Sequence, residues 1–196
     1  MALLTTMLGG IGNSNQSLNT TDTPTFTGIK TLLNIGTVAT GSTVVEYGDG
    51  LYHTSIITVN TTLPAIAGGA NLAIGKLIYT LPAGACVVSF PYISIAITQT
   101  QGNINADTPD VGLGTTIASG VVALLSGTAA FENIMTGQTA ANCTGTATVN
   151  TSIVHTDIAA ADDHTIYVNV ADGWAASGDA AALLTGTVVL QWSFLS

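Results

Sequence analysis

The chain has 196 residues, of which 47% are hydrophobic and only 7% are charged, and its formal net charge is -9. Lys30 and Lys76 are its only Lys or Arg residues. Sites that grip phosphate need guanidinium forks or clustered ammonium groups, and nucleic-acid surfaces need a basic stripe. The composition therefore excludes such sites and argues against contact with DNA, RNA or anionic membranes. High hydrophobicity with low charge predicts a chain that folds, with room for one sizeable core.

Residues 1–42 differ in composition from the rest of the chain. They combine Gly9, Gly10 and Gly12 with a long polar stretch, and they show neither helical nor strand periodicity. We expect an extended N-terminal arm that lies along its own body or along a neighbouring subunit. The first residues lack the basic region of a secretory signal peptide, so we expect no secretion signal.

From residue 43 onward, apolar and polar residues alternate with a period of two, which predicts half-buried strands. Clusters of Gly, Pro and Asp separate these stretches and predict turns. The predicted fold class is all-β, an antiparallel β-sandwich or jelly roll over residues 43–196. The expected inward-facing sets are Ile57, Val59 and Leu63; Ile93, Ile95 and Ile97; Ile166, Val168 and Val170; and Val188, Leu190, Trp192 and Phe194.

Three local signals predict irregularities in this pattern. Gly75 stands where the apolar residues change parity, which indicates a β-bulge. Pro91 predicts an edge, a bulge or the start of a strand. Residues 129–135 are the best candidate for a short helix.

Few residue types suited to catalysis or metal binding are present. His53, His155 and His164 lack metal-ligand spacing, and we expect three surface positions with structural or solvated roles. Cys86 and Cys143 are expected to be buried small hydrophobes, with a disulfide as the alternative. No motif selects a nucleophile, a phosphate loop or a carboxylate pair. We therefore predict no enzyme activity, no catalytic residue, no cofactor and no metal.

Two loops carry weaker candidates for binding. Asp107 and Asp110 flank Pro109 and offer hard oxygen ligands suited to calcium, although a proline-linked turn is the commoner cause of such a pattern. Trp174 lies in a Gly/Ala-rich loop that we expect to be exposed. It is either a platform for stacking a sugar or an anchor at a subunit interface, and we favour the interface.

Two stretches resemble proteins of tailed-bacteriophage virions. Residues 17–32, SLNTTDTPTFTGIKTL, resemble the Asn-Thr-x-Asp-x-Pro-Thr-Phe-x-Gly signature in the stalks and collars of phage fibre proteins. Residues 76–196, with IYTLPAGACVV, ADTPDVGLGT and DDHTIYVNVADGW, resemble small tailed-phage structural proteins that include capsid decoration proteins. The fibre signature occurs once and precedes a single compact domain, which favours a decoration role over a fibre.

The resemblance implies an all-β virion structural protein, a homotrimer fixed to the outer surface of the capsid. Its partners would be the major capsid protein and other copies of this chain, and it would stabilise the shell as a cement protein. Assembly in the host cytoplasm would keep both thiols reduced.

The alternative is a head-fibre or tail-fibre module that binds a receptor or carbohydrate. It would use exposed aromatic residues in a groove, and the candidates are Trp174, Tyr92 and Tyr167. For the capsid-binding hypothesis, Phe26 is the expected apolar anchor of the arm. The residues assigned to capsid or subunit contact are Asp22, Pro24, Phe26, Gly28 and Trp174.

Overall fold

The computed structural model describes residues 36–48, 51–66, 73–119, 124–127, 130–174 and 180–195. They belong to one compact unit, which spans Leu32–Ser196. The regular structure of these residues is entirely β, and they contain no helix that is long and apolar enough to cross a membrane. The strands are β1 Thr37–Val38, β2 Ser42–Gly48, β3 Tyr52–Thr62, β4 Ile74–Thr80, β5 Cys86–Gln101, β6 Asp110–Gly114, β7 Met135–Thr139, β8 Thr144–Thr151, β9 Thr156–Ile158, β10 Thr165–Ala171 and β11 Ala181–Phe194.

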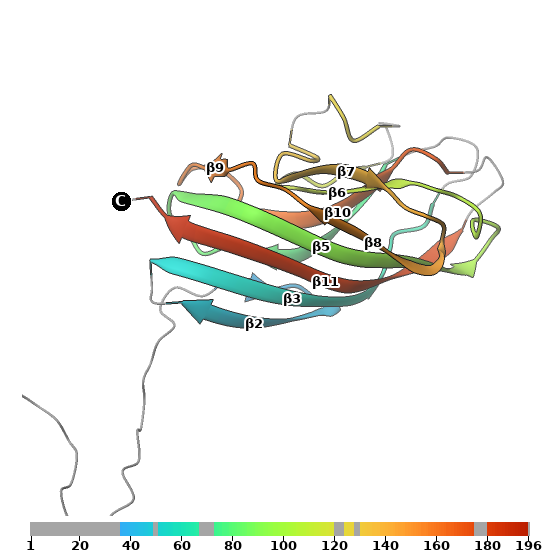
Figure 1. Ribbon diagram of the computed structural model, residues 1–196, viewed down its shortest axis with the longest axis horizontal. Coiled ribbons are helices and arrows are strands. Elements are labelled where there is room, and N and C mark those ends of the chain that lie inside the picture. Colours follow the sequence, from blue (N-terminus) through green and yellow to red (C-terminus); the bar gives the residue numbers. More distant parts are fainter. Residues whose placement is uncertain are drawn as a thin grey trace, which may run out of the picture. The chain divides into compact units, whose positions relative to one another are not determined.

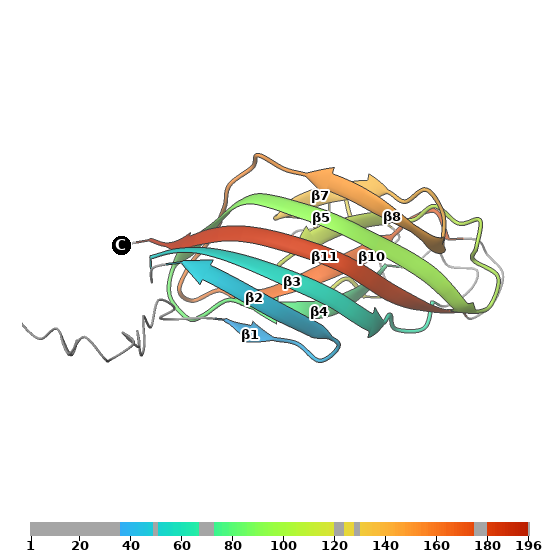
Figure 2. The same cartoon turned by 60° about the horizontal axis from the view of Figure 1, so that its bottom comes forward.

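The strands form two antiparallel sheets (Figures 1 and 2). The five-stranded sheet has the order β1-β4-β10-β6-β7, and the six-stranded sheet has the order β2-β3-β11-β5-β8, with β9 paired to β5. The all-β prediction is confirmed, in a sandwich-like arrangement. β1 and the start of β2 fall within residues 1–42, so the part of the expected arm from Thr37 onward belongs to the sheets.

The core lies between the sheets and is built by the predicted alternation. Ile57, Ile95, Val168 and Leu190 are all 0% exposed and belong to one hydrophobic cluster that draws on both sheets. Full burial of such a side chain stabilises the fold by about 1.5–3 kcal/mol. Phe194 is only partly buried and packs against the edge of this cluster.

Of the three alternatives expected at Pro91, an edge, a bulge or the start of a strand, the structure has the bulge, within β5. Val189 pairs with Tyr92 and Gln191 pairs with Ser89, so Phe90 and Pro91 together oppose a single residue of β11. Phe90 has a φ of 45°, a left-handed conformation that is unfavourable for an aromatic residue. The bulge therefore re-aims Phe90 out of the normal strand alternation.

Two other local predictions are wrong. The register between β4 and β10 is regular at Gly75 and shifts at Ile78, so the bulge lies later in the strand. Gly75 is needed for another reason, because a Cβ there would lie 2.3 Å from Oδ1 of Asn169. The helix expected over residues 129–135 does not form: residues 130–134 make turns and bends, and Met135 begins β7.

The outer face of the five-stranded sheet is covered by the chain's own loops near its centre. Asn169 of β10 is 0% exposed although its parity places it away from the core. Its side chain accepts a hydrogen bond from the Ala118 amide at 2.9 Å and donates to the carbonyl oxygens of Thr116 and Phe131, at 2.9 and 2.7 Å. A second hydrophobic cluster lies beside it, made of Ala73, Ala118, Leu125, Phe131 and Ala171.

Candidate functional site: the outer face of the six-stranded sheet

Among the described residues, the five long strands of the six-stranded sheet direct no charged side chain to its outer face; the short strand β9 at the margin carries the exposed Asp157, which pairs with Val87 of β5. In the five long strands β2, β3, β11, β5 and β8, the single Asp, Glu, Lys or Arg is Glu46, which is 9% exposed and points into the core. We call the outward side chains of these strands the neutral face. Because the chain has a net charge of -9, a broad surface without an acid is a distinct region of this protein.

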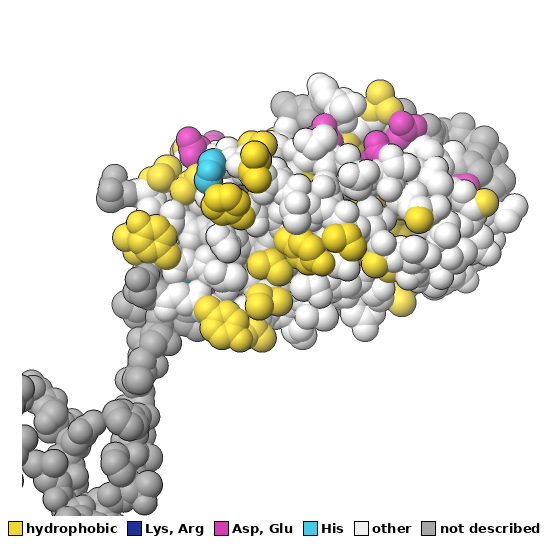
Figure 3. All heavy atoms as spheres, in the orientation of Figure 1, with side chains coloured by type: hydrophobic (Ala, Val, Ile, Leu, Met, Phe, Trp, Pro, Cys, Tyr) yellow, Lys and Arg dark blue, Asp and Glu magenta, His cyan; other side chains and the backbone are white. Residues whose placement is uncertain are grey.

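The neutral face also carries large exposed apolar side chains. Val45, Tyr47, Tyr52, Phe90 and Val149 are 51–65% exposed, and the loop after β8 adds two more. Figure 3 shows hydrophobic side chains spread over this side of the molecule, with the visible Asp and Glu side chains mostly along its upper margin. Single exposed apolar residues are ordinary, but a contiguous set on one face is typical of a binding surface.

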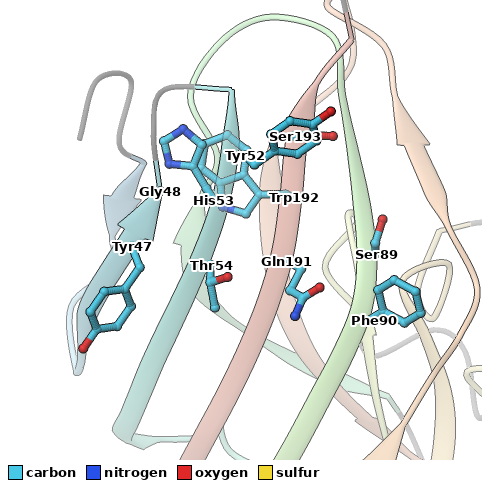
Figure 4. A pocket seen from close by; sticks show the side chains of 10 residues that line it. All are labelled: Tyr47, Gly48, Tyr52, His53, Thr54, Ser89, Phe90, Gln191, Trp192 and Ser193. Atoms are coloured by element: carbon cyan, nitrogen blue, oxygen red, sulfur yellow. The ribbon is translucent and has the colours of Figure 1, made fainter. Parts of the chain in front are cut away.

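A hollow of about 480 Å³ lies at one end of the neutral face, where β3 begins and β11 ends. We call it the aromatic hollow (Figure 4). Four adjacent strands contribute to it, and three of its side chains are exposed aromatic rings. The lining residues are Tyr47, Gly48, Tyr52, His53, Thr54, Ser89, Phe90, Gln191, Trp192 and Ser193.

Strand register places four of these side chains in one row across the sheet. Tyr47 pairs with Thr54, Thr54 pairs with Gln191, and Gln191 pairs with Ser89. Directly paired residues point to the same side of a sheet, so the row crosses β2, β3, β11 and β5 in that order. In Figure 4, the Tyr47 and Phe90 rings stand at opposite ends of this row.

His155 supports the Phe90 end of the row. Its Nδ1 lies 2.8 Å from the Ser89 hydroxyl, and its ring meets Phe90 edge-on with centroids 5.4 Å apart. His155 is exposed, as expected, and these contacts hold the Phe90 wall from the side.

An aromatic stack lies beneath the hollow. His53 and Trp192 are paired across β3 and β11, and their rings stack at 4.0 Å with an interplanar angle of 7°. Phe194 meets both rings edge-on. The prediction of a surface position for His53 is wrong: the residue is 3% exposed because its parity on β3 points inward, and its ring nitrogens have no hydrogen-bond partner among the described residues.

A buried polar network continues inward from this stack. The Trp192 indole donates to the Ser55 hydroxyl at 2.8 Å, and Ser55 donates to Oε1 of Glu46 at 2.7 Å. The Tyr79 hydroxyl donates to the same carboxylate oxygen and accepts from the Gly36 amide. Burial and the hydrogen bond to Glu46 raise the pKa of Tyr79 well above its usual range, so the phenol stays protonated as a donor.

Of the five residues assigned to capsid or subunit contact from the sequence, Trp174 is the one that lies among the described residues. Trp174 is 6% exposed and lies in the main core cluster, so the expectation of an exposed indole is wrong. The loop packs inward because that buries the large apolar ring. Tyr92 lies on β5 and Tyr167 on β10, in different sheets, so the two tyrosines share no groove with each other. The remaining assigned positions, Asp22, Pro24, Phe26 and Gly28, lie outside the described residues.

The two candidate calcium ligands lie at the start of β6: Asp107 is in the turn before the strand, and Asp110 is its first residue. Asp110 accepts a hydrogen bond from the Thr139 hydroxyl at 2.7 Å, and Asp107 is 7% exposed. In the part of the chain that the structure describes, no three His, Cys, Asp or Glu side chains are grouped to hold a metal ion. His164 is half-buried, and its Nε2 donates to the Gly84 carbonyl at 2.7 Å.

Cys86 and Cys143 are free thiols, each 0% exposed, which confirms that they are buried and corrects the disulfide alternative. Burial raises the pKa of Cys86 to about 11. Burial, together with the negative charge of Asp107, raises the pKa of Cys143 to about 12. Neither thiol is activated as a nucleophile, because activation requires a lowered pKa.

The lining of the aromatic hollow was not anticipated from the sequence. Its signal is three aromatic residues at positions where the strand alternation calls for polar side chains: Tyr47, Tyr52 and Phe90. Comparison of the chain with protein-family models, curated proteins and solved structures finds no match. The functional argument therefore starts from the neutral face and its hollow.

Proposed function

We propose that the protein is a non-enzymatic structural protein of a tailed-bacteriophage virion, which binds the outer surface of the capsid as a homotrimer and stabilises the shell. Its partners are the major capsid protein and other copies of this chain. The observation that carries the proposal is the neutral face: in a chain of net charge -9, the outward side chains of five adjacent long strands are uncharged and include exposed apolar residues.

A neutral face favours protein contact for two electrostatic reasons. Copies of an acidic chain repel one another wherever acids meet, and burying an unpaired carboxylate is costly. Apolar side chains and threonine hydroxyls carry neither penalty. β11 has 14 residues and extends roughly 46 Å at about 3.3 Å per residue, so most of the face lies beyond the hollow at its end. This longer part, with Val45, Ile56 and Val149, is the proposed contact surface.

The strand order supports the more specific fold, a jelly roll. Without β1, β2 and β9, the sheets read β3-β11-β5-β8 and β4-β10-β6-β7. Eight strands in two antiparallel sheets with this alternation match a jelly roll, an architecture of viral capsid and lectin domains. Because one fold serves many functions, the strand order adds to the proposal without carrying it.

The mechanism is mechanical and thermodynamic. A protein that binds the assembled shell and not its free subunits shifts the equilibrium toward the shell by mass action. The net charge of -9 suits the outside of a capsid better than its DNA-facing lumen.

The arm is assigned to the capsid. Asp22–Gly28, with Phe26 as its apolar anchor, would contact the capsid or a neighbouring copy. Deletion of residues 1–30 is expected to abolish sedimentation with capsids while the circular dichroism spectrum of the sheets is unchanged. Retained capsid binding would remove the arm from the proposal.

Light scattering tests the oligomer, with one substitution placed on each sheet. Thr58 lies on the neutral face, paired with Thr43 and Thr187, and Thr136 is exposed on β7 of the other sheet. The wild-type protein and Thr136→Asp are expected to have the mass of a trimer, whereas Thr58→Asp places an acid in the contact and is expected to give monomers. A monodisperse wild-type monomer would refute the trimer. A trimeric Thr58→Asp variant would show that the contact between copies lies outside the neutral face.

A further inference from the structure

The aromatic hollow has a lining that is polar without being charged. Thr54, Ser89 and Ser193 offer hydroxyls, and Gln191 offers an amide, so each donates and accepts hydrogen bonds. The described lining residues include no Asp, Glu, Lys or Arg. Such a set does not select an anion or a cation. It matches a ligand whose own groups are neutral and both donate and accept, as sugar hydroxyls do.

Aromatic rings stand at the margins of this polar row. Tyr47, Tyr52 and Phe90 are 60%, 65% and 51% exposed, so each presents a large apolar surface to a ligand. Between Tyr47 and Ser89 lie three strand spacings of about 4.8 Å, or roughly 14 Å in all. A pyranose has an apolar C–H face and a rim of hydroxyls, so rings flanking a hydroxyl- and amide-lined floor match both parts of a short oligosaccharide.

Phe90 is held in this position at a structural cost. Its φ of 45° and its place in a bulge are unfavourable, yet half of its side chain stays in solvent and adds little to the core. Strained backbone and bulges that aim an exposed side chain are concentrated at functional sites. The contact with His155, itself bonded to Ser89, fixes the ring further.

The hollow lies across strands that are already paired. The His53–Trp192 stack beneath it is buried and packed against Phe194. β3 and β11 each pair on both sides, so their backbone groups are taken up by the sheet and cannot add a peptide strand. A ligand here must bind through side chains, which favours a saccharide over an extended peptide.

We propose that the aromatic hollow is a binding site for a neutral saccharide, with Tyr47 and Phe90 as stacking walls and Thr54, Gln191 and Ser89 as the hydrogen-bonding floor. The site uses none of Trp174, Tyr92 or Tyr167. It adds a ligand-binding activity to the proposed virion protein, and it does not depend on capsid attachment or on the trimer.

Isothermal titration of the full-length protein tests the site. The probes are maltohexaose, cellohexaose, mannohexaose and chitohexaose, preceded by an array of neutral glycans, with oligogalacturonate as the charged counterpart. At least one neutral glycan is expected to bind with a Kd below about 1 mM. Absence of binding across the neutral array at that concentration, or binding of the charged oligomer alone, would overturn the proposal.

Two substitutions separate ligand binding from folding. Tyr47→Ala is expected to weaken binding at least about tenfold, because it removes a stacking wall. Phe90→Gly is expected to weaken binding by a similar factor while the melting temperature stays the same or rises, since glycine adopts a φ of 45° without strain. Tyr92→Ala is the matched control, an aromatic on the same face outside the hollow, and is expected to bind as the wild type does.

Three results of this series would count against the site. Unchanged affinity in both Tyr47→Ala and Phe90→Gly would place the saccharide elsewhere. Equal loss in Tyr92→Ala would mean that the whole face, and not the hollow, is involved. A change in oligomeric mass with unchanged saccharide binding would assign the hollow to a contact between copies of the chain.

Discussion

The five-stranded sheet has the centre of its outer face covered by the protein's own loops, whereas no loop among the described residues covers the neutral face of the six-stranded sheet. We refer to the two as the covered face and the bare face. On the covered face, Asn169 is 0% exposed and its amide group is fully engaged by loop backbone. On the bare face, Val149 and Tyr47 are 57% and 60% exposed. Both sheets are antiparallel and share one core, so the difference lies only in what packs on their outer sides.

Acidic side chains are also distributed unevenly between the two sides of the molecule. A second hollow, of about 310 Å³, is lined by loop residues 115–116, 130 and 133 together with Asp157, Ile158, Asp162 and Asp163. Acids thus gather beside the covering loops and β9, and the outward side chains of the five long strands carry none. On the covered face, polar and apolar side chains find their contacts within the chain. The bare face has the composition of a surface that contacts another molecule.

The largest expected loss of stability comes from removing the side chain that holds the loops on the covered face. Asn169→Leu removes the partner of the buried Ala118 amide, of the buried Phe131 carbonyl and of the partly buried Thr116 carbonyl; a buried group left unpaired costs about 1–3 kcal/mol. We expect the free energy of unfolding to fall by about 3 kcal/mol or more in urea titrations. Asn60→Leu, an exposed position on β3, is the control and should change it by less than about 0.5 kcal/mol. Equal effects of the two substitutions would contradict the comparison.

A somewhat smaller effect is expected from apolar side chains on the two faces. Leu125 is 2% exposed in the covering cluster, so Leu125→Ala should cost about 2–4 kcal/mol. Val149→Ala, on the bare face, should cost less than about 0.5 kcal/mol in the dissociated chain. Thermal melts at low protein concentration measure both. A large loss of stability in Val149→Ala would show that side chains of the bare face contribute to the stability of the single chain, and this would contradict the comparison.

The core that both sheets share should respond to alkaline pH. The pKa values of Cys86 and Cys143, about 11 and about 12, lie above the ordinary value of 9.0, so the folded state holds these protons longer than the unfolded state. Stability is then complete below about pH 9 and declines as pH rises, by up to about 1.4 kcal/mol per pH unit for each thiol. Urea titrations across this range should show a shallower decline in Cys86→Ala. An unchanged slope would refute the thiol origin.

The smallest effect is expected from salt. Contacts made by an uncharged face lack ion pairs, so the trimer and the capsid complex should persist from about 0.1 M to about 1 M salt, where the Debye length falls from about 10 to about 3 Å. Light scattering and capsid sedimentation at both concentrations provide the measurement. Dissociation at moderate salt would mean that charged groups outside the neutral face make the contact.

The inward-facing core was predictable residue by residue. Ile93, Ile95 and Ile97 were assigned from alternation, and all are at most 1% exposed, because side chains on a strand alternate sides with a fixed period. Pro91 likewise indicated an edge, a bulge or the start of a strand, since proline cannot donate a hydrogen bond to the ladder, and a bulge is present. These predictions depend only on neighbours in the sequence.

The candidate site was not predictable in the same way. Alternation gives each strand two sides, but it does not say which outward side chains a distant loop will cover. Asn169 and Tyr47 both occupy outward positions, and only the loop that returns to Asn169 distinguishes them. Trp174 is the opposite case. Its Gly/Ala-rich surroundings in the sequence indicated an exposed side chain, but the fold buries it in the core.

By itself, the sequence determined what kind of contacts this protein makes. With Lys30 and Lys76 as its only Lys or Arg residues, it has no cluster of cationic side chains to offer a partner, and its period-two body folds as two sheets. The tertiary structure decided where contacts are made. Thr54 and Gln191 meet only through the pairing of β3 with β11, and the Thr116 and Asn169 that close the other face are 53 residues apart. Such proximity depends on chain closure over long separations, which local periodicity does not encode.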